Sequence, residues 1–274
     1  MICTIDWFGP NRQPCPQCAR RANDRTCGVT LDAAGNGVAH CFRCEYVETH
    51  RQQQTETHHR VATATTIAPI KHLVLSAYGR GLWAECNPLH GIALDYLNAR
   101  SCVIPPEGSH LRYHQALKHG PSGFVGVALV ALVTDAITAE PLTLHRTWIQ
   151  PDGKKAPLDP PRMWLGGHRK SGGVVRLWAE DFVTSGLGIA EGIESALSLA
   201  HAHQPVWACL DAGNLAALPV LSGIESLLIA VDHDDAGIRA AENCAARWAG
   251  AGREVGVVMP EIHKTDLNDI ARAA

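Results

Sequence analysis

The stretch LGIAEGIESALSLAHAHQPVWACL, residues 187–210, decides the fold of this sequence. It begins with a short apolar run at 187–190, continues through a helical candidate at 192–203 and ends in a second apolar run at 206–210. Unbroken apolar runs of this length are typical of strands in a parallel sheet that is covered on both faces. A strand, a helix and a strand in this order form a β-α-β unit. The stretch therefore predicts an α/β layer.

The same alternation continues to the end of the sequence. Two more apolar runs of strand length follow, at 227–231 and 255–258. Helical candidates at 213–221 and 235–250 separate the strands, and a short one ends the chain. We therefore predict a Rossmann-like, mainly parallel sheet for residues 181–274.

The region before this layer has a different pattern. Apolar residues between 71 and 100 recur at helical spacing, which predicts two helices, the second at 91–100. Residues 124–133 and 142–148 are rich in β-forming residues and predict a hairpin. The expectation for residues 71–180 is an α+β segment.

Acidic residues follow the predicted strands of the last third. Glu191 follows the first strand, Asp232 and Asp234 follow the third, and Asp266 and Asp269 follow the fourth after a short loop. The carboxyl ends of parallel strands form a ligand crevice, so these side chains are expected to converge. Hard oxygen ligands without a His/Cys set indicate Mg²⁺ or Mn²⁺. Each residue alone has a simpler reading as a helix cap, but three groups at successive strand ends favour a metal site.

Two C-x-x-C pairs lie near the start of the chain. Cys15 with Cys18 and Cys41 with Cys44 are separated by a segment that has the alternation and the Gly-Asn-Gly turn of a hairpin. Four thiolates arranged in this way close a tetrahedral Zn²⁺ site and leave no open position. Residues 1–48 therefore predict a small β zinc ribbon with structural zinc.

Some features of the ribbon leave alternatives open. Cys27 and His40 are possible substitute ligands, and the cysteines have an alternative reading as incidental or redox residues. The basic residues around the ribbon fit nucleic-acid phosphates or, equally, a solvated face. They are Arg20, Arg21, Arg25 and Arg43.

Composition and charge bound the classes of function. Hydrophobic residues make up 46% and charged residues 19%, as in soluble globular proteins. There is neither an apolar run of about 18 residues nor a secretory signal at the start, so we expect a cytoplasmic protein without membrane contact. The polar residues 49–70 predict a linker between the ribbon and the rest.

The basic residues are concentrated in the middle of the chain. Residues 61–180 hold twelve Lys/Arg against eight Asp/Glu, whereas residues 181–274 hold five against thirteen. A basic middle next to an acidic end suits a metal-dependent nucleic-acid enzyme. Gly172 and Gly173 would let backbone approach phosphates. The candidate phosphate-binding cations are Arg112, Arg146, Lys154, Lys155, Arg169, Lys170 and Arg176.

The acidic motifs resemble a known family. IAEG at 189–192, AVDHDDAG at 230–237 and KTDLND at 264–269 resemble the Toprim fold shared by bacterial-type primases, topoisomerases and some nucleases. The sequences of these motifs are most similar to those of Toprim primases of plasmids, phages and integrated elements. Such primases carry a zinc ribbon at the same place, and residues 96–100 and 111–114 resemble the segment between.

The resemblance implies site roles. Glu191, Asp232 and Asp234 would be the principal Mg²⁺ ligands, with Asp266 and Asp269 in support. These five residues would form the catalytic set.

Two departures from the family pattern concern a second metal. Ser195 stands where an acidic residue is common, with Glu194 one residue earlier, and Asn268 stands where an aspartate is common. Both put the occupancy of a second metal in doubt.

The resemblance also implies a function. The chain would be a DNA primase that makes short RNA primers on single-stranded DNA from nucleoside triphosphates by Mg²⁺-dependent nucleotidyl transfer. No phosphate loop of the G-x-x-x-x-G-K-[ST] type is present, so a separate replicative helicase is a candidate partner. The alternatives are a Toprim nuclease and a non-catalytic module that binds single-stranded nucleic acid. A topoisomerase is disfavoured because none of the tyrosines, Tyr46, Tyr78, Tyr96 and Tyr113, lies after the Toprim segment.

Overall fold

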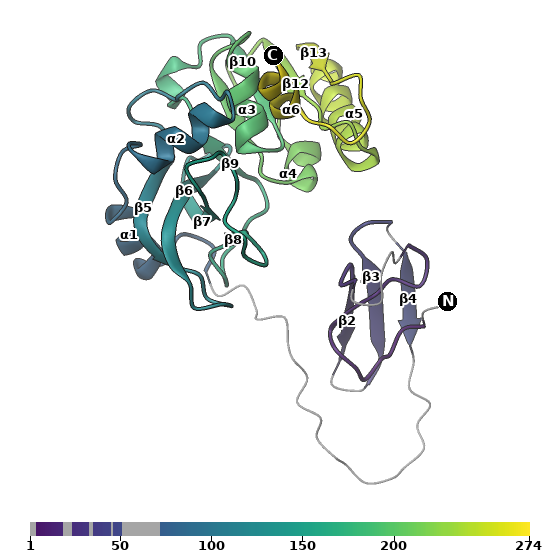
Figure 1. Cartoon of the computed structure of the whole chain (residues 1–274). Helices are drawn as coiled ribbons and strands as arrows, with labels where there is room; N and C mark the ends of the chain where they lie inside the picture. Colours follow the sequence, from purple (N-terminus) through teal and green to yellow (C-terminus); the bar gives the residue numbers. More distant parts are fainter. Residues whose placement is uncertain (1–3, 19–23, 33–34, 45, 51–71) are drawn as a thin grey trace, which may run out of the picture. The chain divides into compact units, whose positions relative to one another are not determined.

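The computed structural model describes residues 4–18, 24–32, 35–44, 46–50 and 72–274 (Figure 1). The chain forms two compact units, Met1–Pro69 and Ile70–Ala274, which are described separately. Nearly all of the predicted linker, as well as Arg20 and Arg21, lies outside the described residues. In the described part of the chain, no helix has the length and apolar character needed to cross a bilayer.

The N-terminal unit is a four-stranded antiparallel sheet in the order β1-β2-β3-β4. The predicted hairpin is confirmed, since β2 and β3 pair in register and place Cys27 opposite Cys41. Cysteines are prominent among its few buried residues, so the unit has little apolar area to stabilise it. The strands are β1 (Arg12–Gln13), β2 (Cys27–Leu31), β3 (Gly37–Cys41) and β4 (Val47–His50).

The C-terminal unit is organised around a single sheet of nine strands, in the order β13-β12-β10-β11-β9-β6-β7-β8 with β5 paired to β6. The four strands β10 to β13 are mutually parallel, as the apolar runs predict. The strands are β5 (Leu111–Lys118), β6 (Val125–Asp135), β7 (Pro141–Trp148), β8 (Arg162–Trp164), β9 (Gly173–Arg176), β10 (Gly186–Ala190), β11 (Val206–Ala208), β12 (Ser226–Ala230) and β13 (Glu254–Val258). The predicted α/β class with a preceding α+β segment is confirmed.

Helices cover both faces of this sheet (Figure 1). Residues of α2 and α3 share one hydrophobic core with the sheet, and residues of α4 and α5 share another. Residues of α1 pack with β6 and β7 in a third core. The helices are α1 (Ala77–Ala84), α2 (Ile92–Ala99), α3 (Ile193–Leu199), α4 (Ala212–Ala217), α5 (Asp235–Gly250) and α6 (Leu267–Ala273).

The sequence predicts the ends of some helices more accurately than those of others. Helix α5 has the predicted bounds, because Asp234 caps its first turn and Ala240, Cys244 and Trp248 form a buried stripe at helical spacing. Helix α4 is shorter than predicted. It ends at residue 217 because Leu218 precedes a proline and takes up an extended ψ of 118°.

Strand β9 is the main feature that the sequence analysis missed. It lies between β11 and β6 and is antiparallel to both, so it joins the hairpin region to the parallel strands. The domain boundary predicted at 180/181 therefore falls within a continuous sheet. Gly173 belongs to β9, where a side chain would meet Val133 Cγ1 at 2.6 Å. Gly172 has φ of 74° and donates its N–H to Asn214 Oδ1 at 3.1 Å. Chain packing thus accounts for both glycines, in place of the predicted approach to phosphate.

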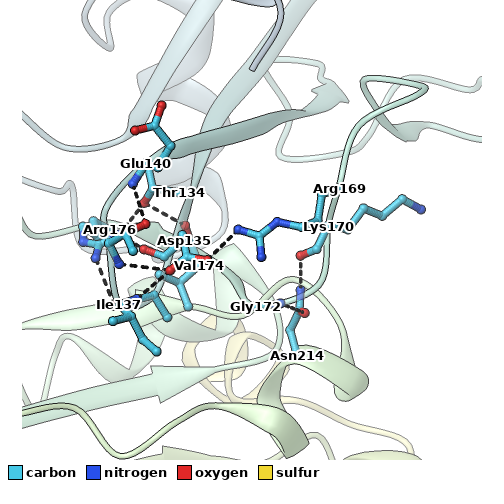
Figure 2. A network of polar contacts seen from close by, with 12 residues as sticks. Thr134, Asp135, Ile137, Glu140, Arg169, Lys170, Gly172, Val174, Arg176 and Asn214 are labelled. Atoms are coloured by element: carbon cyan, nitrogen blue, oxygen red, sulfur yellow. Dashed lines mark hydrogen bonds and ion pairs between the residues drawn. The ribbon is translucent and has the colours of Figure 1, made fainter. Parts of the chain in front are cut away.

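A buried polar network holds β9 to the turn after β6 (Figure 2). Arg176 is 2% exposed and donates to the Thr134 hydroxyl, to the Asp135 carbonyl at 3.2 Å and to the Ala136 carbonyl at 3.3 Å. Arg169 forms an ion pair of 2.6 Å with the Asp135 carboxylate. The prediction that Arg176 binds phosphate is therefore wrong, because its guanidinium is used inside the protein.

Replacing Arg176 with methionine is expected to lower the free energy of unfolding by about 2–4 kcal/mol, because buried oxygens would lose their donor. Urea unfolding of the full chain measures this change. The exposed Arg239 of α5 supplies the control, and Arg239→Met should change stability by less than about 0.5 kcal/mol. Equal effects of the two substitutions would contradict the structural role.

Candidate active site and four-cysteine group

The carboxyl ends of the parallel strands bring the predicted acidic residues together. Glu191 directly follows β10, and Asp232 lies two residues beyond the end of β12. Both line a cavity of about 370 Å³, together with Glu194 and Asp266. A smaller adjoining pocket of about 150 Å³ shares Asp232 and Asp266 and is also lined by Asp234 and Asp269. All five predicted carboxylates therefore surround two adjoining hollows.

Three of these carboxylates also cap helices. Asp234 Oδ1 accepts the N–H groups of Ala236 and Gly237 at the start of α5. Asp266 and Asp269 form a reciprocal capping box at the start of α6. Capping and ligand binding are compatible at Asp234, because both capping bonds use Oδ1.

Glu191 and Asp232 are electrostatically unsatisfied. Burial, together with Asp232 and Asp234, raises the pKa of Glu191 to about 7. Burial, together with Asp266 and Asp234, raises the pKa of Asp232 to about 6. Asp232 Oδ1 is buried and has no hydrogen-bond partner among the described residues. A bound divalent cation would supply the missing positive charge, so this donor set fits Mg²⁺ or Mn²⁺.

These carboxylates do not form a closed cage for a metal. Within the described residues, the four cysteines make up the single group of three or more possible ligands whose ligand atoms all lie within 4.8 Å of one another. Open carboxylate sites suit Mg²⁺, which retains several water molecules and binds substrate phosphates.

Glu194 is a carboxylate of a different kind. Its Oε1 accepts the Tyr96 hydroxyl at 2.7 Å and lies 3.5 Å from Lys155 Nζ. Although burial by itself raises the pKa of Glu194, Lys155 and Tyr96 lower it to about 2. Because its charge is already compensated, Glu194 does not need a metal. It holds Lys155 against the cavity.

Asn268, at the second departure from the family pattern, faces the protein interior. It is fully buried and its Nδ2 donates to the Arg100 carbonyl at 2.7 Å and to Ser198 Oγ at 3.0 Å. These bonds fasten α6 to α3 and to the end of α2. The side chain therefore has a structural task and faces away from the acidic hollows.

The predicted cations of the middle segment are dispersed. Lys155 lines the large cavity, and Lys170 Nζ lies 5.2 Å from the ring centre of Trp164, which also lines it. Lys154 pairs with Asp152 at 3.0 Å and is largely exposed. The others do not line the cavity: Arg112 lies over the Trp83 ring, Arg146 donates to the Trp164 carbonyl and Arg169 pairs with Asp135.

Several residues that line the cavity were not predicted as site residues, among them four that lie before residue 186. Arg100, His145, Arg162 and Trp164 line the large cavity together with the acidic groups. Arg100 belongs to the quoted segment 96–100, so the family resemblance offered a signal for it. Arg162 and Trp164 lie on the three-residue strand β8, which is too short to show a pattern.

The N-terminal unit brings the four predicted cysteines together. The Sγ atoms of Cys15 and Cys44 lie 3.6 Å apart, and those of Cys18 and Cys41 lie 3.5 Å apart. Sulfurs bound to one Zn²⁺ at about 2.3 Å lie about 3.8 Å apart in a tetrahedron, so the spacing fits zinc. The N–H groups of residues 17 and 43 each point at a sulfur at 3.4 Å, which stabilises thiolates. This is the predicted four-cysteine zinc-binding group.

The alternative ligands lie outside the group. Neither Cys27 nor His40 belongs to the described cluster of possible metal ligands. His40 stands edge-on to the Phe42 ring at 5.1 Å. Arg43, a predicted phosphate contact, pairs with Asp24 at 2.7 Å.

Comparison with protein-family models identifies the domain formed by the C-terminal part of the chain. A family model described as "Toprim domain" matches residues 186–274. Residues 186–274 form a Toprim domain. This confirms the resemblance for the part that holds all five acidic residues. A second model, described as a domain of unknown function (DUF7146), matches residues 75–177. No curated protein matches the chain.

Three solved structures are similar to parts of the chain or to most of it. A DNA primase domain from Pseudomonas aeruginosa is 13% identical over 68% of this chain and 56% of its own, with a TM-score of 0.38. The primase fragment of the bacteriophage T7 primase-helicase protein is 16% identical over 94% and 92%, with a TM-score of 0.40. The zinc-binding and RNA polymerase domains of the Aquifex aeolicus primase are 16% identical over 67% and 53%, with a TM-score of 0.45.

Proposed function

We propose that this protein is a DNA primase that joins nucleotides on a single-stranded DNA template by Mg²⁺-dependent nucleotidyl transfer. The observation that carries this proposal is the cavity of about 370 Å³, in which residues from outside the Toprim domain face its carboxylates. Its size lies within the range of small-molecule sites, about 300–1,000 Å³. The cavity has an acidic half and a basic half. A nucleoside triphosphate needs both, because carboxylates hold the metal that binds its phosphates and cationic side chains balance the remaining negative charge.

The acidic half would hold the divalent cation. Glu191 and Asp232 are the principal ligands in this proposal, with Asp234, Asp266 and Asp269 in support. When bound, Mg²⁺ neutralises charge that develops on the reacting phosphate and helps to activate the attacking hydroxyl.

The basic half would position the triphosphate. Arg100, Lys155 and Arg162 line the cavity, and Glu194 anchors Lys155 through the 3.5 Å ion pair. A lysine held in this way keeps its orientation and retains donors for phosphate oxygens. The protein contributes position and charge, which are the main requirements of phosphoryl and nucleotidyl transfer.

The N-terminal unit would contact the template. We infer that its four cysteines hold structural zinc. In this proposal the chain consists of a zinc ribbon at 1–48, a linker at 49–70, and a catalytic core whose N-terminal subdomain (71–180) and Toprim domain (181–274) share one sheet. The template is single-stranded DNA, the substrates are nucleoside triphosphates, and a separate helicase would open the duplex. Exposed Arg25 fits a role in template binding.

The proposal is tested by incubating the full chain with single-stranded DNA of mixed sequence, labelled nucleoside triphosphates and Mg²⁺. Short products that need all three components, and that are absent with Asp232→Ala, are the expected result. Metal-dependent shortening of the DNA without new products would show a Toprim nuclease. DNA binding with neither activity would show a non-catalytic module.

A further inference from the structure

Three histidines are buried in the described part of the chain, His119, His145 and His168. Both ring nitrogens of His119 have partners, a serine hydroxyl at 2.7 Å and a backbone carbonyl at 3.0 Å. Both ring nitrogens of His168 also have partners, a backbone carbonyl at 2.9 Å and a backbone N–H at 3.1 Å. His145 differs, since its imidazole has no hydrogen bond to any described residue and its Nδ1 is fully buried.

His145 lies in the wall of the proposed nucleotide cavity. It is 9% exposed, and its side chain comes from β7. Because Nδ1 is fully buried, the ring nitrogen that a ligand in the cavity could reach is Nε2, and no described residue forms a hydrogen bond with it. The two histidines with satisfied rings, His119 and His168, do not line this cavity.

The imidazole is uncharged. Burial, together with the nearby cations Arg162 and Lys155, lowers the pKa of His145 to about 4, against a smaller opposing effect of Glu194. A neutral imidazole has one donor and one acceptor nitrogen. Such a group can form a hydrogen bond with an uncharged hydroxyl, whereas a phosphate forms stronger, charge-assisted hydrogen bonds with the cations of the same cavity.

The neighbours of His145 indicate which part of a nucleotide it meets. The Trp164 ring lies 5.3 Å away, edge-on at 76°, and is an aromatic surface on which a base can stack. Arg162 and Lys155, two cations suited to phosphates, line the same cavity. A nucleotide that stacks its base on Trp164 and directs its phosphates to these cations would bring its sugar to His145, which lines the same cavity.

We propose that His145 hydrogen-bonds a sugar hydroxyl of the nucleotide held in this cavity and so determines which sugars the protein accepts. This inference rests on the proposed function, because it takes the ligand to be a nucleoside triphosphate. It adds a specificity-determining residue, and it gives Trp164 the task of holding the base.

The test is calorimetric binding of four probes to the full chain in the presence of Mg²⁺: ATP, 2′-deoxyATP, 3′-deoxyATP and inorganic tripolyphosphate. Loss of one neutral hydrogen bond should weaken binding of one deoxynucleotide about 3- to 10-fold relative to ATP. In His145→Phe, which retains an aromatic ring beside Trp164, ATP should bind as weakly as that deoxynucleotide does. Tripolyphosphate should bind the two proteins equally.

A matched control is His119→Phe. His119 is also buried edge-on to a tryptophan, with ring centres 4.8 Å apart, but it does not line the cavity. This variant should lose stability and retain the preference for ATP. His145→Asn, which keeps a donor and an acceptor, should recover part of the preference, which a role in folding alone would not produce.

Other outcomes overturn the inference in distinguishable ways. If tripolyphosphate binds but His145→Phe still discriminates between ATP and the deoxynucleotides, His145 does not contact the sugar. If the variant instead loses discrimination among ATP, GTP, CTP and UTP, the imidazole contacts the base. If no probe binds wild-type protein, the cavity is not a nucleotide site and the proposed function fails with the inference.

Discussion

Replacing Asp232 with asparagine is expected to abolish catalysis and, at the same time, to stabilise the metal-free protein. Removing a metal ligand that carries charge should lower the rate of nucleotide joining at least about 100-fold, since several kcal/mol of transition-state stabilisation depend on the cation. The stability effect has the opposite sign because burial and the neighbouring carboxylates disfavour the ionised form of Asp232. Thermal and urea unfolding without divalent metal measure it.

The pH dependence of this effect follows from the raised pKa. Asp232 has an ordinary pKa of 3.8 and a folded pKa of about 6, so its ionisation costs folding free energy that develops between these values. The advantage of Asp232→Asn should be about 3 kcal/mol well above pH 6 and should vanish below about pH 4. Mg²⁺ should stabilise the wild type and leave the variant largely unchanged.

The control for Asp232→Asn is Glu242→Gln, which neutralises an exposed carboxylate of α5. This variant should retain both the activity and the response to Mg²⁺. A metal-free Asp232→Asn protein that is less stable than the wild type at pH 8 would show that the Asp232 carboxylate makes stabilising contacts and that the acidic hollow is not strained.

Replacing Cys41 with serine is expected to remove zinc and to unfold the N-terminal unit alone. Cys15 and Cys41 are fully buried in a core that consists of few residues. Structural zinc in small units contributes roughly 10–16 kcal/mol of apparent binding free energy, so losing one of four thiolates leaves too little to hold the fold. Metal analysis should find one zinc per wild-type chain and a large loss in the variant.

In Cys41→Ser, we expect the function that needs the N-terminal unit to be lost and the function of the C-terminal unit to be retained. Template-dependent synthesis should be lost, whereas Mg²⁺-dependent binding of ATP should persist, because the described residues that line the cavity all belong to the C-terminal unit. The matched control is Cys27→Ala, which removes the cysteine paired opposite Cys41 across β2 and β3 but outside the four-cysteine group. Zinc loss from Cys27→Ala as well would mean that the ligand set differs from the four predicted cysteines.

Much of the fold was predictable because it follows from local patterns. The apolar runs that became β10, β12 and β13 are buried strands of a parallel sheet, and helix α5 has its predicted ends because a capping aspartate and an apolar stripe are local features. Short strands were missed. Strands β8 and β9 have three and four residues, and their pairing depends on partners elsewhere in the chain.

The acidic half of the candidate site was also predictable, because parallel strands end at the same edge of their sheet. Glu191, Asp232 and Asp266 therefore converge without any further information. The basic and aromatic half was not, because Arg100, His145 and Arg162 come from three separate elements whose meeting depends on how the hairpin region packs.

The amino-acid sequence by itself determines the parallel α/β layer, the acidic edge and the two cysteine pairs, because periodicity and spacing are local properties of the chain. The tertiary structure gives different roles to residues of the same chemical type. It pairs Glu194 with Lys155 but leaves Asp232 without a cation, and it buries Arg176 while Arg162 reaches the cavity. The physical reason is that the behaviour of a charge depends on burial and on partners, and both are supplied by residues distant in the sequence.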